Sequence, residues 1–68
     1  MTITESPNPS PILRYFEYAH LPPELAAFSE PFAALAQRIE RVLPAGPEKS
    51  VALRKLLEAK DAAVRAAL

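Results

Sequence analysis

The sequence predicts an all-α fold: an antiparallel two-helix hairpin with an extended N-terminal arm, which assembles into a homo-oligomer. Two long stretches repeat apolar residues at helical spacing, and a short segment with the single glycine, Gly46, joins them. The chain has 68 residues and no cysteine. A chain this short builds a small core and no disulfide can reinforce it, so we expect self-association to supply the missing stability.

Residues 1–12 read as a flexible arm that precedes a helical-hairpin domain over residues 13–68. Pro7, Pro9 and Pro11 stand among serine, threonine and asparagine, a composition that offers little to bury. No basic stretch precedes an apolar one, so we expect no signal peptide. No run of eighteen apolar residues indicates a membrane span, and we expect a soluble, cytoplasmic protein with no membrane partner.

The stretch LRYFEYAH, residues 13–20, alternates in a way that favours an extended segment, with one helical turn as the alternative. Its aromatic rings have two interpretations of equal weight. They cap the open end of the hairpin, or Tyr15, Tyr18 and His20 form a stacking platform beside the cation of Arg14. His20 alone does not make a metal site, and we predict neither a metal nor a cofactor.

The first helix is predicted over about residues 21–43. Its apolar residues are spaced 4, 3, 4, 3, 4 and 3 apart, as on a helix in coiled-coil or hairpin packing: Leu21, Leu25, Phe28, Phe32, Leu35, Ile39 and Val42. Pro31 interrupts this run, so a second helix could begin after Ser29. Because the apolar phase continues through Pro31, we favour one proline-kinked, nearly continuous helix.

The second helix is predicted over about residues 47–67. Pro44, Gly46 and Pro47 form a tight connection before it, and Glu48 is well placed against the helix dipole. The rest is rich in alanine and leucine, which favour helix.

Lys60 is the unusual residue of the second helix, because it falls near the centre of the apolar stripe. Three interpretations remain open. Its stem covers apolar surface while the ammonium reaches water; or it donates to Ser29, Glu30 or the carbonyl of Ala27, which Pro31 leaves free; or it meets an anionic ligand at an oligomer interface.

Charge composition excludes some classes of function. Eight basic and eight acidic side chains balance, so the chain lacks the positive field of a duplex DNA binder. The pairs Arg54–Glu58 and Asp61–Arg65 predict a solvated ion-pair strip. Glu58 and Asp61 have no histidine partner or pocket-forming sequence around them, so we predict that the protein is not an enzyme.

Two stretches together resemble a known family. HLPPELAAFSEPFAALA, followed by LPAGPEKSVALRKLLEAKDAAVRAAL, is similar to the small helical-hairpin domain of the phage anti-CBASS and anti-Thoeris cyclic-nucleotide sponges. The resemblance covers about residues 15–68. The second helix agrees with the family's frame at Glu48, Lys49, Ser50, Ala52, Leu53, Lys55, Leu56, Glu58 and Ala59, whereas Arg54 stands where the family usually has threonine.

The resemblance implies a homo-oligomer of hairpins, often a hexamer, in the cytoplasm of a phage's host. Such proteins hold cyclic oligonucleotide or cyclic ADP-ribose-type immune signals between subunits and do not hydrolyse them. Carried over to this chain, Tyr15 or Tyr18 would stack on a base, and Lys49, Ser50 and Arg54 would lie near the ligand. The alternative function is a small oligomeric interaction or regulatory module without a nucleotide ligand.

Overall fold

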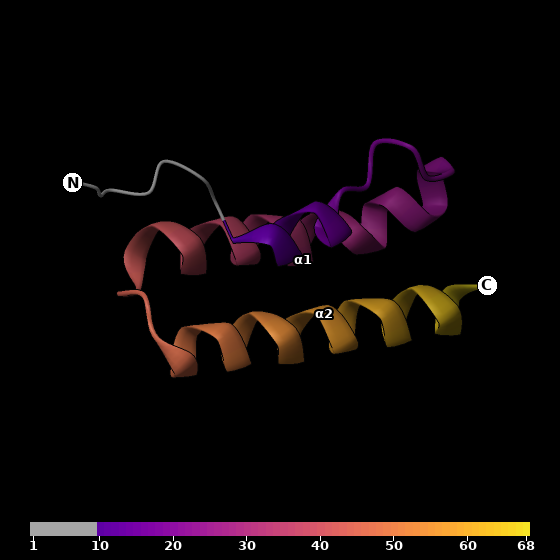
Figure 1. Ribbon diagram of the computed structural model, residues 1–68. Coiled ribbons are helices and arrows are strands. Elements are labelled where there is room, and N and C mark those ends of the chain that lie inside the picture. The colour runs from indigo at the N-terminus through magenta and orange to yellow at the C-terminus, as the bar shows by residue number, and fades with distance from the viewer. Residues whose placement is uncertain (1–9) are drawn as a thin grey trace.

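A computed structural model describes residues 10–68, which form three helical elements. They are a 3₁₀ helix, η1 (Pro11–Phe16), and two α-helices, α1 (Pro23–Val42) and α2 (Pro47–Ala67) (Figure 1). The all-α class is therefore confirmed for this part of the chain. Most of the predicted flexible arm, residues 1–9, lies outside the described residues.

Helix η1 corrects the prediction of an extended segment. Its 3₁₀ turn begins at Pro11, whose missing N–H is not needed in a first turn, and Leu13 donates its N–H to the carbonyl of Ser10 at 3.0 Å. Residues three apart lie on one side of a 3₁₀ helix, so Leu13 and Phe16 are buried together. Burial of these two side chains outweighed the alternating pattern, and helical structure reaches back into the predicted arm.

Helix α1 is continuous through Pro31, as the unbroken apolar phase predicted. It begins at Pro23 behind Pro22, whose carbonyl accepts from the N–H groups of Leu25 and Ala26. Pro31 has no N–H to donate to the carbonyl of Ala27. The helix persists because its other backbone bonds and its packing compensate for this single loss.

Helix α2 has the bounds that the sequence predicted. Gly46 precedes it with φ 157° and ψ 175°, a backbone conformation that residues with a Cβ rarely adopt. Its carbonyl accepts the N–H of Ser50 at 3.2 Å, which closes the first turn of α2. The single glycine therefore allows the chain to leave α1 and start α2 after four residues.

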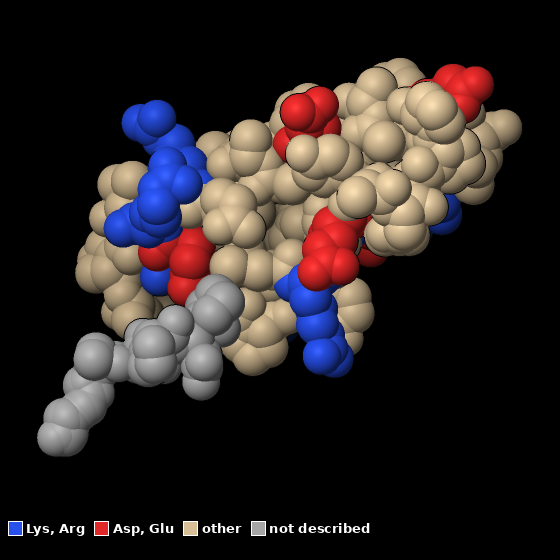
Figure 2. All heavy atoms as spheres, turned by 90° about the horizontal axis from the view of Figure 1, so that it is seen from above, with Lys and Arg blue, Asp and Glu red and all other residues tan. Residues whose placement is uncertain are grey.

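The two α-helices lie side by side with opposite chain directions, and η1 lies against both of them (Figure 1). Four side chains form the buried core: Leu13 and Phe16 of η1, Ala36 of α1 and Leu53 of α2. Partly buried residues pack around them, namely Ile12, Phe32, Ala33, Ile39, Leu56 and Leu57. On the side of α1 and η1, charged side chains form separate small groups on a largely uncharged surface (Figure 2).

The predicted apolar seam of the first helix is wrong in three of its seven positions. Phe28, Leu35 and Val42 are 54%, 46% and 63% exposed, whereas Ser29 and Ala36 are fully buried. Helix α1 packs against two elements, α2 and η1. The face of α1 that both of them contact carries the small residues Ser29 and Ala36. A two-helix pairing alone would have buried the large residues.

Candidate functional site

One hollow gathers three of the predicted ligand residues, Tyr15, His20 and Lys60. We call it the basic pocket. It has a volume of about 340 Å³ and lies between η1, the segment after η1 and the second half of α2. Its lining residues are Arg14, Tyr15, Glu17, His20, Leu21, Lys60, Asp61, Val64 and Arg65. Three of these are lysine or arginine and two are acidic, so the pocket has an excess of basic side chains.

Arg14 and Tyr15, which both line the basic pocket, form a cation–π pair. The guanidinium carbon of Arg14 lies 5.3 Å from the centre of the Tyr15 ring, and Nη2 donates to the Tyr15 hydroxyl at 3.4 Å. This hydrogen bond raises the pKa of Arg14 above its usual value. Tyr15 is 55% exposed, so a flat group can still stack against its ring.

Lys60 reaches the basic pocket with its stem covered. Its side chain is only 12% exposed, and Nζ lies 2.8 Å from Oδ1 of Asp61. This ion pair explains how a lysine is accommodated beside an apolar stripe, because its ammonium keeps an anionic neighbour. No hydrogen bond joins Lys60 to Ser29, Glu30 or the carbonyl of Ala27 in the described residues, so the second interpretation of Lys60 is not supported.

Tyr18 lies elsewhere, in a larger and more apolar hollow of about 610 Å³ between η1, the segment after it and α1. We call this the apolar pocket. Its lining residues are Leu13, Phe16, Glu17, Tyr18, Ala19, His20, Glu30, Ala33, Ala34 and Gln37. His20 lines both hollows. The two tyrosines that the sequence offered as alternative stacking groups are therefore placed at different hollows.

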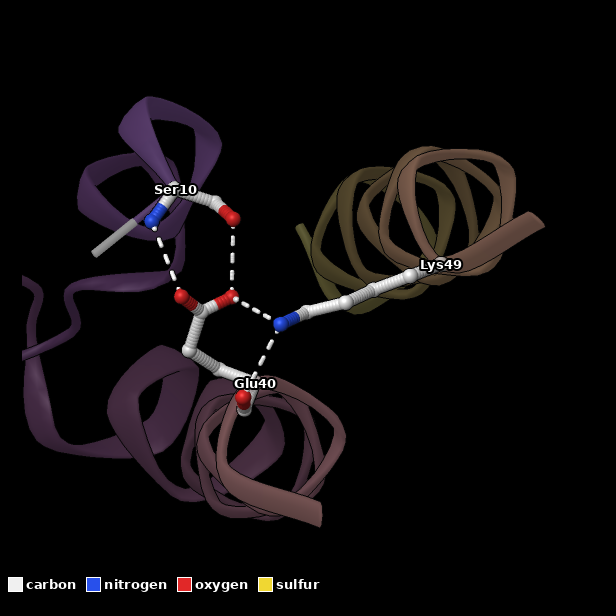
Figure 3. Close-up of polar contacts among 3 residues, drawn as sticks. All are labelled: Ser10, Glu40 and Lys49. Atoms are coloured by element: carbon white, nitrogen blue, oxygen red, sulfur yellow. Dashed lines mark hydrogen bonds and ion pairs between the residues drawn. The ribbon is translucent and has the colours of Figure 1, made fainter. Parts of the chain in front are cut away.

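Lys49 is at the far end of α2 and has structural partners. Its Nζ donates to the carbonyl of Glu40 at 3.0 Å and lies 3.4 Å from Oε1 of the same residue (Figure 3). Ser10 donates to the Glu40 carboxylate through its N–H at 3.1 Å and its hydroxyl at 2.7 Å. Eleven residues separate Lys49 from Lys60, which corresponds to about 16 Å along a helix. The structure does not bring these two lysines into one site.

Ser50 and Arg54 are exposed on α2 and line neither pocket. The predicted ion-pair strip also differs from the structure. Glu58 pairs with Lys55 at 3.6 Å, not with Arg54, and Asp61 pairs with Lys60. Arg65 consequently forms no ion pair in residues 10–68.

Arg65 is the residue of the basic pocket that the sequence reasoning missed. It stands four positions after Asp61, one turn along α2, so these two side chains lie on the same flank of the helix and line the same pocket. That spacing was visible in the sequence. The position of η1, which forms the opposite wall, was not.

Comparisons with family models, curated proteins and solved structures gave no match to this chain. Across residues 10–68, no group of three or more histidine and acidic side chains is arranged to hold a metal ion. None of the helices described here combines the length and apolar character that crossing a bilayer requires.

Proposed function

We propose that this chain binds and sequesters a cyclic nucleotide signal in the basic pocket and does not hydrolyse it, as an anti-defence protein of the phage sponge type. The observation that carries the proposal is the convergence of Tyr15, Lys60 and Arg65 in one hollow. The resemblance of residues 15–68 to the anti-CBASS and anti-Thoeris sponges suggests the class of function, whereas Lys49, Ser50 and Arg54, the ligand residues that it implies on α2, lie outside this pocket.

The side chains of the basic pocket match the two chemical parts of a nucleotide. The exposed ring of Tyr15 offers a face to a base, and Arg14 and Arg65 are guanidinium donors that suit phosphate oxygens. Lys60 adds a cation whose present partner is Asp61. A phosphate would compete with Asp61 for this ammonium, which gives binding a dependence on salt.

The volume of the basic pocket, about 340 Å³, is at the lower end of the range of small-ligand sites, about 300–1,000 Å³, so it suits a part of a cyclic dinucleotide or cyclic ADP-ribose better than the whole molecule. We propose that a neighbouring subunit of a homo-oligomer, a hexamer in the form most often implied by the resemblance, completes the site. In a phage-infected cell the protein would act in the host cytoplasm.

A thermal-shift and calorimetric screen tests the proposal. Purified full-length protein is titrated with cyclic di- and trinucleotides and with cyclic ADP-ribose isomers, and at least one ligand is expected to raise the melting temperature. Tyr15→Ala and Arg65→Gln should weaken that ligand's binding at least tenfold. Arg41→Gln, which removes the same charge at an exposed position that lines none of the hollows, should leave this binding unchanged.

The recovered ligand distinguishes sequestration from catalysis. After incubation, heating the complex should release the ligand chemically intact, as chromatography can show. A panel without any shift in melting temperature, or equal losses of affinity in Arg41→Gln and Arg65→Gln, contradicts the proposal.

The second candidate is an interaction module without a nucleotide ligand. The exposed apolar residues Phe28, Leu35 and Val42 favour it, because an apolar patch on one helix face is typical of a contact with another protein. Absence of any ligand shift together with self-association would select this function.

A further inference from the structure

Helix α1 carries an exposed row of large apolar side chains, Phe28, Leu35 and Val42, which we call the α1 stripe. The three residues are seven apart, so they lie along one line of the helix with a drift of only about 20° per step. A line of this spacing is the pattern with which one helix packs along another.

The α1 stripe lies on the side of α1 away from η1. Ala33 and Gln37, which line the apolar pocket together with η1, are about 140° and 180° around the helix from Phe28. Helix η1 therefore covers another side of α1, and about half of the surface of each side chain of the stripe stays exposed in residues 10–68.

We propose that the α1 stripe is a two-fold contact with a second copy of this chain. The two α1 helices run antiparallel in this contact, and Phe28 of one copy faces Leu35 of the other. Because the contact is two-fold, the pair of Phe28 and Leu35 occurs twice in it, so both residues are buried in each copy.

Charge complementarity selects a second copy and this register. Glu24 and Arg38 flank the α1 stripe on the same edge, are exposed, and form no ion pair in residues 10–68. The antiparallel register that places Phe28 against Leu35 brings Glu24 of each copy to Arg38 of the other. A two-fold contact requires such a self-complementary surface, and the zero net charge of the chain removes long-range repulsion between copies.

Cysteine crosslinking tests the register, since the natural chain has no cysteine. The double variant Phe28→Cys/Leu35→Cys should form a disulfide-linked dimer under mild oxidation. Each single variant should not, because its two copies of the same position would be about 10 Å apart along the axis. The same separation prevents a disulfide within one helix. Crosslinking in either single variant, or none in the double variant, overturns the register.

Light scattering and sedimentation of the uncrosslinked protein test the surface itself. The wild type should be a dimer or a larger assembly, and Leu35→Glu should lower its association at least tenfold. Ala62→Glu adds the same charge at an exposed position of α2 and should not. Reversal of the flanking charge in Glu24→Arg should weaken association, and Glu24→Arg/Arg38→Glu should restore it.

A monomeric wild type at micromolar concentration, or Leu35→Glu that associates normally, overturns the proposal. Circular dichroism of each variant separates lost association from lost folding, and a variant that has unfolded is replaced by Leu35→Ala. These measurements use no nucleotide. Loss of ligand binding in a protein that still associates through the α1 stripe would count against the function proposed for the basic pocket and not against this contact.

Discussion

At the scale of single residues, Glu40 holds three parts of the chain together. Its carboxylate accepts two hydrogen bonds from Ser10 before η1 and lies 3.4 Å from the ammonium of Lys49 on α2 (Figure 3). The hydrogen bond from the Ser10 hydroxyl is the main cause of the lowered pKa of Glu40, and Lys49 contributes further. Because these partners prefer the ionised carboxylate, ionised Glu40 stabilises the attachment of η1.

The lowered pKa makes this stabilisation dependent on pH. It is fully present above the ordinary carboxyl value of 4.5 and is lost as pH falls through the lower folded value. At pH 7, Glu40→Gln should lower the free energy of unfolding by about 1 kcal/mol. Thermal melting of the wild type and of Glu40→Gln from pH 7 to pH 2.5 should show that the difference between their stabilities disappears below about pH 4.5. A difference that is constant over this range would contradict the role of the charge.

Ser29 is a polar residue in an apolar position. It is fully buried, and its hydroxyl has no hydrogen-bond partner in residues 10–68. A buried hydroxyl without a partner costs free energy that an apolar side chain of similar size avoids.

Ser29→Ala should therefore raise the free energy of unfolding by about 1 kcal/mol. Ser50→Ala removes the same hydroxyl from an exposed site of α2 and should change stability by less than about 0.5 kcal/mol. Urea denaturation of both variants is the measurement. A destabilised Ser29→Ala variant would show that the hydroxyl has a partner in solution.

At the scale of the elements, Gly46 determines how α2 starts. A Cβ at this position would meet no atom within 4 Å, so space does not restrict the residue. The restriction is the backbone, whose φ of 157° disfavours every residue with a side chain.

Gly46→Ala should accordingly destabilise the fold by about 1–3 kcal/mol. Ala45→Gly, a change in the same connection, provides the comparison and should cost less than about 1 kcal/mol. Thermal unfolding by circular dichroism measures both. A neutral Gly46→Ala variant would mean that the connection relaxes to an ordinary conformation.

At the scale of the whole molecule, stability depends on very few side chains. Only Leu13, Phe16, Ala36 and Leu53 are buried apolar residues in the described chain. A domain of this size has little stability to lose, so each of them matters more than it would in a larger protein.

Leu53→Ala should cost about 2–5 kcal/mol and leave most of the chain unfolded at 37 °C. Leu53 is 1% exposed, whereas nearby Val51 is 46% exposed, so Val51→Ala should cost less than about 1 kcal/mol. Far-ultraviolet circular dichroism at increasing temperature compares them. Similar losses in the two variants would contradict the assignment of the core.

Apolar periodicity and the positions of proline and glycine were enough to predict the two α-helices of this protein. The spacing of apolar residues predicted α1 through Pro31, and Gly46 between prolines predicted the start of α2, because both signals depend on neighbours in sequence. The same signals failed for η1. A six-residue 3₁₀ helix has too few positions for a period, and its burial depends on contacts with α1 and α2.

The candidate site was predictable in its residue types and less so in its grouping. Tyr15, His20 and Lys60 do share one hollow, but Lys49 pairs with Glu40 and Tyr18 lines the apolar pocket. Which side chains meet is decided by the path of η1 across the helix pair. That path results from long-range packing of Leu13 and Phe16 and from the bonds between Ser10 and Glu40.

The sequence by itself determined that the chain is helical, where α2 begins and ends, and that α1 continues through its proline, since these follow from local backbone preferences and apolar spacing. Only the tertiary structure decided which face of α1 is buried. Adding η1 as a second neighbour turned Ser29 and Ala36 inward and left Phe28, Leu35 and Val42 exposed. The reason is that burial is a property of the whole assembly of elements, and no single helix specifies how many neighbours it will have.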